Sequence, residues 1–381
     1  MLAVLALGGY APRTSTANSV PHGPLSMRDR ATVPTASHLA ATSPHRAAVW
    51  LGHQSVVASV RIQSDKRTLD IQYRDGASLV ILPPELHAHW VPSRGFTRLS
   101  TTHGPVRDGA QPRALVLEPF AHQLGRTEAQ TLTAKLTQQG FKVDLYEDQA
   151  VTVGVLESMA NYSVVYIRSH SNVYGDGDAM VVTGETDAGP YAALFQDGSV
   201  AQATVAGEPN TNLYVAIRAP FFTKHVGMFP TDSVVFINGC AVLGATTFWG
   251  ALHSRGDSAL IGWDNEVYSF VNEAAASAVF DHFGAGQSVR DDIKAATDLG
   301  YGVSTVGDKV SHLGYTGNGD LTLQEVLTQS APTPTAASTP IPTATPTSTP
   351  TPHKKKLHCK RGYHIVHGKC RHCKNGKCKK R

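Results

Sequence analysis

Two apolar runs of the chain each end in a residue that can do chemistry. The first run, Ser163-Val-Val-Tyr-Ile-Arg-Ser, ends at His170, and the second, Ser233-Val-Val-Phe-Ile-Asn-Gly, ends at Cys240. Runs this rich in Val, Ile and aromatic residues predict strands buried on both faces, as in parallel sheets covered by helices. Because ligands of such sheets bind beyond the carboxyl ends of the strands, we expect the two side chains to meet there. An imidazole beside a thiol can generate the nucleophilic thiolate, which predicts a cysteine hydrolase.

Predicted strands and helices alternate from about residue 114 to residue 325. This alternation indicates an α/β fold with a mostly parallel sheet sandwiched by helices. Thr127 with Gln130, and Ser288 with Asp291, are each spaced as a capping box at the start of a helix. The predicted strands are 114–117, 141–146, 163–170, 233–240 and 258–263, and the predicted helices are 127–139, 155–160, 247–254, 270–283 and 288–299.

The order of these features resembles the caspase-like cysteine peptidases, which include caspases, clostripain, gingipains and the CHAT peptidases. The resemblance covers roughly residues 110 to 327. It depends on a His that ends one strand, a Cys that ends the next, and the small-residue strand Ala-Leu-Ile-Gly-Trp-Asp at 259–264. A late segment, 313–323, resembles the closing strand of the gingipain-like branch. The resemblance implies a caspase-like peptidase of protein or peptide substrates, with His170 as general base or acid and Cys240 as the acylated nucleophile.

The resemblance also implies an oxyanion hole formed by the backbone N–H groups of Cys240 and Ser171. Such donors stabilise the tetrahedral intermediate. The family usually has Gly after its catalytic His, whereas this chain has Ser171. If that position requires a positive φ, Ser would carry strain that Gly avoids. The alternative is therefore a catalytically inactive caspase-like binding or adhesion protein. A transpeptidase would use the same acyl chemistry, so the sequence does not separate transfer from hydrolysis.

Substrate preference is expected to depend on carboxylates near the same edge of the sheet. Glu118 directly follows the strand 114–117, and the resemblance implies that a residue lining the S1 pocket comes from this region. Asp264 is a second candidate, and Trp263 is expected to wall the pocket. A carboxylate in this place would favour Arg or Lys at P1. The alternative for each carboxylate is a solvated loop charge or a helix cap.

The charge of the chain is divided between two very different parts. The formal net charge is +4, but residues 353–381 contain 12 Lys or Arg and no Asp or Glu. The rest of the chain therefore has 22 basic and 30 acidic residues, a net charge of −8. We expect the basic tail to bind anionic cell-surface polymers. No signature of a nucleic-acid-binding module accompanies it, and no specific nucleic acid is expected as a partner.

The cysteines point to an exported protein. Four of the five lie in the tail, whereas Cys240 is alone in the large domain and free to react. Four Cys in a small basic module predict two disulfides, with a zinc site that includes nearby His residues as the alternative. We therefore expect a secreted or surface-associated enzyme, and no metal or cofactor is predicted at its active site. The tail cysteines are Cys359, Cys370, Cys373 and Cys378.

Five segments are predicted along the chain. Residues 1–45 are expected to be disordered or to hold an export segment, 46–108 to form a small β-rich segment that acts as a prodomain or an extra layer, 109–330 to form the peptidase domain, 331–352 a Pro/Thr-rich linker, and 353–381 the basic Cys-rich tail. No apolar run reaches the length of a transmembrane span.

A long insertion, 171–231, is expected to fold as hairpins over the active-site edge. A calcium site at Asp176, Asp178 or Glu185 is an alternative use of this insertion.

Overall fold

The computed structural model describes residues 23–84, 111–174, 177–208, 211–284 and 286–328, together with the backbone of three strands near the C-terminus. The chain divides into two compact units, Met1–Thr333 and Pro334–Arg381, and the division falls inside the predicted linker. The second unit contains an antiparallel sheet of β15 (Tyr363–Val366), β16 (Lys369–Lys374) and β17 (Lys377–Cys378). The predicted linker and the side chains of the predicted disulfides or zinc site lie outside the described residues.

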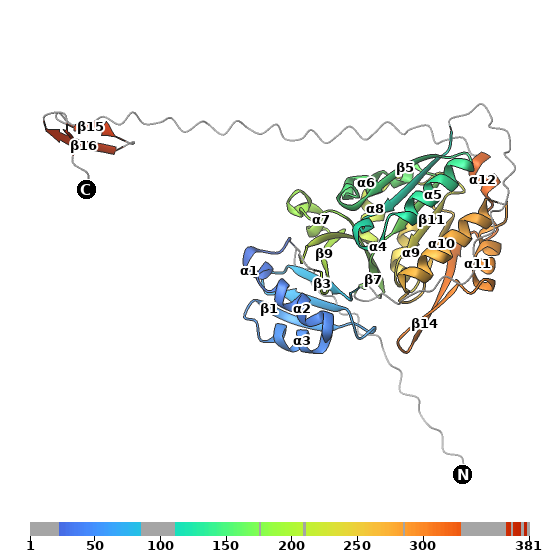
Figure 1. Cartoon of the computed structure of the whole chain (residues 1–381), viewed down its shortest axis with the longest axis horizontal. Coiled ribbons are helices and arrows are strands. Elements are labelled where there is room, and N and C mark those ends of the chain that lie inside the picture. Colours follow the sequence, from blue (N-terminus) through green and yellow to red (C-terminus); the bar gives the residue numbers. More distant parts are fainter. Residues whose placement is uncertain are drawn as a thin grey trace, which may run out of the picture. The chain divides into compact units, whose positions relative to one another are not determined.

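A seven-stranded sheet, here called the parallel sheet, forms the centre of the first unit (Figure 1). Its order is β13-β14-β12-β11-β6-β4-β5. Strands β5, β4, β6, β11 and β12 run parallel to one another, and β14 and β13 are antiparallel additions next to β12. The predicted α/β fold with a mostly parallel sheet is thereby confirmed. The strands are β4 (Arg113–Glu118), β5 (Lys142–Glu147), β6 (Val164–Arg168), β11 (Val234–Asn238), β12 (Ala259–Trp263), β13 (Val303–Val306) and β14 (Lys309–Gly317).

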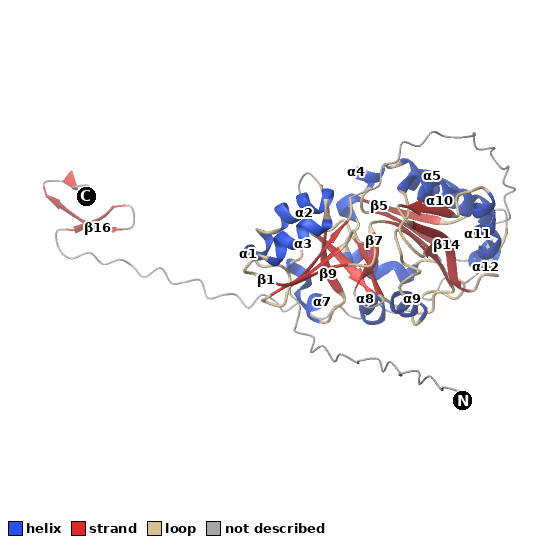
Figure 2. Ribbon diagram, turned by 90° about the horizontal axis from the view of Figure 1, so that it is seen from below, coloured by secondary structure: helices blue, strands red, loops and turns tan. Residues whose placement is uncertain are grey.

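Helices cover both faces of the parallel sheet because alternate residues of its strands point to opposite sides (Figure 2). In β4, Leu115 and Leu117 belong to one apolar core, and Ala114 and Val116 belong to the other. The first core includes residues of α6 (Val153–Glu157), α7 (Ala192–Gln196), α8 (Ala219–His225) and α9 (Thr246–His253). The second includes residues of α5 (Thr127–Gln138), α10 (Ser269–Phe283), α11 (Val289–Asp298) and α12 (Leu323–Thr328). Short helical turns complete the unit at α4 (Ala121–Leu124), η1 (Asp148–Ala150), η2 (Ser158–Asn161) and η3 (Gly189–Tyr191).

A second seven-stranded sheet, here called the mixed sheet, joins the N-terminal segment to the long insertion. Its order is β1-β2-β3-β9-β10-β8-β7. Strand β3 of the N-terminal segment pairs in parallel with β9 of the insertion, and the other neighbours are antiparallel. The N-terminal β segment is therefore continuous with the insertion, which the sequence did not indicate. The strands are β1 (Val57–Ile62), β2 (Leu69–Tyr73), β3 (Ser78–Leu82), β7 (Ser171–Tyr174), β8 (Asp178–Val182), β9 (Val200–Val205) and β10 (Tyr214–Arg218).

The prediction of disorder through residue 45 is wrong for the described part of that segment. Three helices lie there, α1 (Met27–Arg30), α2 (Val33–Thr42) and α3 (Pro44–Gly52). Apolar side chains of α2 and α3 pack on β1 to β3 in one core, and this burial offsets the weak local signal. Because α3 crosses residue 45, the predicted boundary between the first two segments is also wrong. Residues 85–110 lie outside the described residues.

The two predicted capping boxes have different outcomes. The Ser288 side chain accepts a hydrogen bond from the N–H of Asp291 at the start of α11, as expected. Helix α5 instead begins at Thr127 itself, with Arg126 in the N-cap position and no capping side chain. The Thr127 prediction was therefore one residue out of place, a common error because helix ends depend on local geometry.

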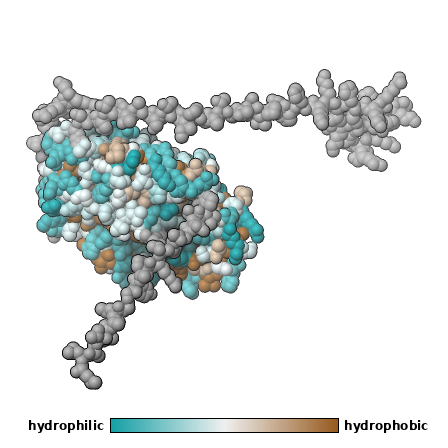
Figure 3. Space-filling model, turned by 180° about the vertical axis from the view of Figure 1, so that it is seen from behind, coloured by the Kyte–Doolittle hydropathy of each residue, from teal (hydrophilic) through white to brown (hydrophobic). Residues whose placement is uncertain are grey.

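The surface of the first unit carries both hydrophilic and hydrophobic residues (Figure 3). Among the described residues, no helix is both long and apolar enough to cross a membrane. The face seen in Figure 3 carries mostly hydrophilic and neutral residues, with hydrophobic ones in small groups.

Asp292 on α11 is fully buried, and the described part of the chain offers no hydrogen bond to either of its carboxylate oxygens. Burial, with the neighbouring Asp291, raises the pKa of Asp292 to about 8. Because this folded-state pKa lies above the ordinary value of 3.8, the stability linked to the group is present at pH 4 and is lost as the pH rises through 8.

We expect Asp292→Asn to raise the free energy of unfolding by roughly 2 kcal/mol at pH 8, and by much less at pH 4. The variant removes the charge that burial disfavours. Denaturant unfolding at the two pH values measures the difference. The exposed Asp298→Asn on the same helix is the control, and an equal effect of D292N at both pH values would contradict the prediction.

Candidate functional site

The two residues expected to act together come from adjacent strands. Strands β6 and β11 are parallel neighbours, and their last residues, Arg168 and Asn238, are register partners. His170 and Cys240 each lie two residues beyond the end of their strand, and both are half-buried. Both line one small pocket of about 60 Å³ at the carboxyl edge of the parallel sheet. The structure therefore brings the predicted pair to the same pocket.

The turns that carry these two residues are held against each other. The Ser171 hydroxyl donates a hydrogen bond of 2.8 Å to the Cys240 carbonyl oxygen. Gly239 fits between the turns because it has no side chain. A Cβ at this position would lie 2.3 Å from the Ser171 Oγ and 2.5 Å from the Ser169 carbonyl oxygen. Both are closer than non-bonded atoms approach, so only glycine fits.

Ser171 does not carry the strain that the sequence suggested. It is a residue of β7 and is not among the described residues with a positive φ. The left-handed backbone instead occurs at Ala241, directly after Cys240, with a φ of 60°. A non-glycine residue in that conformation is uncommon and is found disproportionately at functional sites. The Ala241 N–H is held by the Asn265 carbonyl oxygen at 3.0 Å.

Gln123 and Phe120 are described neighbours of the His170 ring. Its Nε2 lies 3.3 Å from the Gln123 Oε1, and its ring packs edge-on against Phe120 with centroids 4.6 Å apart. The Gln123 amide nitrogen in turn donates to the Glu208 carboxylate at 2.8 Å. Gln123 was not singled out in the sequence, where an amide in the short helix α4 gives no signal. In the structure it is a described hydrogen-bond partner of the imidazole.

Glu118 does not lie in the pocket, which corrects the first prediction about substrate recognition. Its side chain is fully buried, and its carboxylate accepts a 2.6 Å hydrogen bond from Arg168. Arg168 is also paired with Glu128 and Glu273. Burial is the largest cause that raises the pKa of Glu118, to about 8, although Arg168 opposes the shift. A buried carboxylate with an internal cation is a structural group and not one that receives a substrate.

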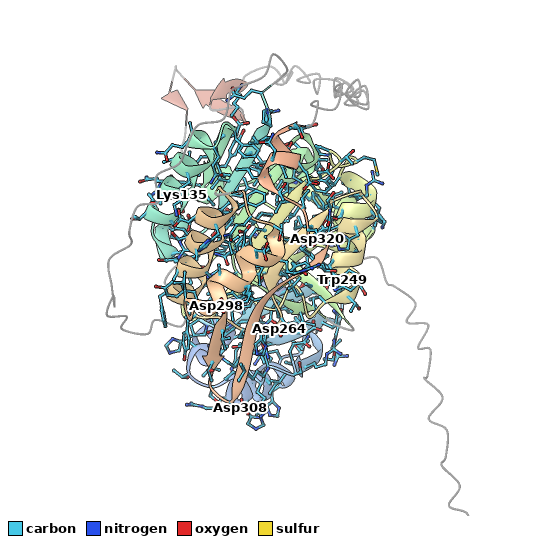
Figure 4. All side chains as sticks on the ribbon, turned by 90° about the vertical axis from the view of Figure 1, so that its right-hand side faces the viewer. Lys135, Trp249, Asp264, Asp298, Asp308 and Asp320 are labelled. Atoms are coloured by element: carbon cyan, nitrogen blue, oxygen red, sulfur yellow. The ribbon has the colours of Figure 1, made fainter. Side chains whose placement is uncertain are left out.

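Trp263 and Asp264 are also outside the set of described residues that line the pocket. Trp263 is fully buried, and its indole N–H donates to the Asn272 side chain at 3.0 Å. Asp264 lies at the surface beside β14, where its carboxylate accepts the His312 N–H at 2.7 Å (Figure 4). Contacts with β14 and with Asn272 decide where these two side chains point, and the sequence does not define those contacts.

The carboxylate that does line the pocket belongs to Glu266, two residues beyond Asp264. Glu266 is 2% exposed, and burial raises its pKa. Its Oε2 lies 2.6 Å from Nη1 of Arg67, which comes from the turn between β1 and β2 and also lines the pocket. Its Oε1 lies 3.9 Å from Nζ of Lys309 on β14. Sequence reasoning missed both Glu266 and Arg67, because they come from distant parts of the chain.

The residues considered for calcium have protein partners. Asp178 pairs with Arg218 at 3.0 Å, and Glu185 accepts a hydrogen bond of 2.7 Å from the Tyr191 hydroxyl. Asp176 lies outside the described residues. Across the described ranges, no group of three or more His, Cys, Asp and Glu is placed to hold a metal ion.

Comparisons with known proteins identify no relative by sequence. No family model matches the chain, and no curated protein matches it. Among solved structures, protein GSU0716 from Geobacter sulfurreducens is 11% identical with a TM-score of 0.29, over 57% of this chain and 97% of that one. The Drosophila initiator caspase Dronc is 12% identical with a TM-score of 0.28, over 61% of this chain and 94% of that one. Similarities at this level carry no argument about activity, which leaves the pocket residues to indicate the chemistry.

Proposed function

We propose that this protein is a caspase-like cysteine endopeptidase with Cys240 as nucleophile and His170 as general base and acid. The observation that carries the proposal is the placement of both side chains in one pocket by adjacent, in-register parallel strands. A thiol and an imidazole at the ends of such strands have the composition that acyl transfer requires. The hydrogen bond from the Ser171 hydroxyl to the Cys240 carbonyl oxygen supports the proposal, because it holds together the turns that carry His170 and Cys240.

The reaction proceeds in two steps, acylation of the Cys240 thiol and hydrolysis of the resulting thioester. The Cys240 thiol gives its proton to His170, and the thiolate sulfur bonds to the carbonyl carbon of the scissile peptide. The C–N bond breaks as His170 returns the proton to the leaving amine, which leaves a thioester. Water then attacks the thioester, loses a proton to His170 and releases the acid, and the sulfur regains its proton. Backbone N–H groups of Cys240 and Ser171 are the proposed oxyanion donors.

The preference for Arg or Lys at P1 is retained as a proposal, with a different residue responsible. Glu118 and Asp264 are excluded by their positions, and Glu266 is the carboxylate that lines the pocket with Cys240. A substrate guanidinium or ammonium would find there a buried partner of opposite charge, and such contacts are strong because water is excluded.

We also propose that the protein is exported and attaches to a surface through its basic tail, on the basis of the amino-acid composition of residues 353–381. Four Cys and twelve basic residues in the last 29 residues suit a small oxidised module that binds anionic polymers. Salt-dependent binding of the full-length protein to an anionic wall polymer, lost in a variant with the tail lysines replaced by glutamine, is the expected result.

Covalent labelling tests the catalytic proposal. Intact full-length protein is treated with peptidyl acyloxymethyl ketones that carry Arg, Lys, Asp or Leu at P1, and the label is located by peptide mapping. We expect one label at Cys240, lost in Cys240→Ala, strongly slowed in His170→Ala, and fastest with Arg or Lys. No label at Cys240 with any reagent would favour the non-enzymatic alternative, a binding or adhesion protein. Product analysis with an added amine separates hydrolysis from transpeptidation.

A further inference from the structure

The pocket beside Cys240 already contains a basic side chain of the protein itself. Arg67 places Nη1 2.6 Å from the Glu266 Oε2, and its other terminal nitrogen lies 3.5 Å from the Pro84 carbonyl oxygen. The Arg67 side chain is 25% exposed and that of Glu266 is 3% exposed. The guanidinium is thus the more exposed member of the pair, and the carboxylate is buried beneath solvent-accessible atoms.

A rigid turn fixes Arg67 in this position. The Asp65 Oδ1 accepts the N–H groups of Arg67 and Thr68, each at 2.9 Å, and Lys66 between them has a φ of 60°. Asn172, two residues beyond His170, donates to the Asp65 Oδ2 at 2.7 Å. The turn is therefore attached to β7, the strand that begins directly after His170.

A second, exposed contact joins the same turn to the β13–β14 hairpin. Lys66 pairs with Asp308 at 3.5 Å, and Asp308 lies at the tip of the β13–β14 hairpin (Figure 4). Strands β2 and β3 continue the N-terminal segment into the mixed sheet, where β3 pairs with β9. Removal of residues 23–84 would strip three strands from that sheet and expose the edge of β9. The turn is consequently part of the folded sheet, whereas the Arg67 side chain beyond it is partly exposed.

We propose that Glu266 is the residue that selects a basic substrate side chain, and that Arg67 is its internal competitor. This inference rests on the proposed peptidase function for its consequence in catalysis. A basic side chain of the substrate takes the place of the Arg67 guanidinium on Glu266, while the turn stays in position. Only molecules in which the Glu266 carboxylate is free of Arg67 can bind the substrate cation. The apparent affinity for the substrate is therefore the intrinsic affinity multiplied by the fraction of such molecules.

Two isosteric probes test the inference without catalysis. Benzamidine is a cation and benzoate an anion of nearly the same shape, and each stabilises the full-length protein in proportion to its binding. We expect Arg67→Gln to bind benzamidine about tenfold or more tightly than the wild type, Arg67→Lys to be intermediate, and Arg67→Gln/Glu266→Gln to lose this binding. Arg61→Gln, on the same hairpin but paired with Asp70 outside the pocket, is the control. Unchanged benzamidine binding in Arg67→Gln would overturn the proposal.

The same variants distinguish the opposite role for Arg67. If Arg67 instead recognises an acidic side chain, the wild type binds benzoate, Arg67→Gln loses that binding, and the proposal is wrong. With peptides, we expect Arg67→Gln to lower KM about tenfold for Arg at P1 with little change in kcat, and Glu266→Gln to remove the preference for Arg. A chain that binds benzamidine as predicted but is never labelled at Cys240 would refute the peptidase function and leave the cation site standing.

Discussion

Replacement of Cys240 by alanine is expected to reduce kcat/KM for a peptide substrate by about 10⁴-fold or more. No other described residue supplies a thiol to the pocket, so the acyl-enzyme cannot form. The thermal midpoint should stay within a few degrees of the wild type, because Cys240 is half-buried and the change to alanine removes a single sulfur atom. Steady-state kinetics and a melting curve of the same preparation provide the measurement.

His170→Ala provides the control for this first prediction. A nucleophile and its base act as a unit, so their losses are not additive. We expect His170→Ala to lose a comparable factor and the double variant to be no worse than Cys240→Ala alone. A Cys240→Ala protein that keeps more than a tenth of the activity would rule out the thiol mechanism. Two independent losses that multiply in the double variant would show that the side chains do not work together.

Replacement of Arg168 by methionine is expected to lower the free energy of unfolding by about 3–5 kcal/mol at pH 8. Arg168 is 1% exposed, and its guanidinium pairs with Glu118, Glu128 and Glu273. Methionine leaves the Glu118 and Glu128 carboxylates in the protein interior without this cation. Arg113→Met is the matched control, because Arg113 pairs with Asp144 near the surface and should cost about 1 kcal/mol or less.

The cost of Arg168→Met should also depend on pH. Burial already raises the pKa of Glu118 to about 8 and raises that of Glu128, in spite of Arg168. Since both folded-state pKa values lie above the ordinary value of 4.5, the stability linked to the two groups is present below pH 4.5 and is lost as the pH rises, for Glu118 through about 8. Without Arg168 the loss becomes larger, so the variant should be less damaging at pH 4.5 than at pH 8. Denaturant titrations across this range test the prediction, and Glu118→Gln in the same background should recover part of the stability. An Arg168→Met cost that is equal at both ends of the range would contradict it.

The buried group around Arg168 shows why a charged residue at a strand end is ambiguous in a sequence. Glu118 follows an apolar run, and the resemblance to caspase-like peptidases placed it at the open edge. Its direction is decided by a cation fifty residues away, Arg168, which draws it inward. Glu266 had the weaker local signal but lies in the pocket, because β12 and β14 bring the loop after Trp263 back to Cys240.

Some features of this protein follow from the sequence alone. The apolar runs define β6 and β11, and their lengths place His170 and Cys240 beyond the ends of the two strands. Local composition is sufficient here, because strands buried on both faces need continuous apolar residues wherever their partners lie. The tertiary structure alone decided that β3 pairs with β9 and that Arg67 meets Glu266. Backbone pairing and ion pairing between distant segments depend on which surfaces the folded core brings together, and no local pattern in the chain encodes that choice.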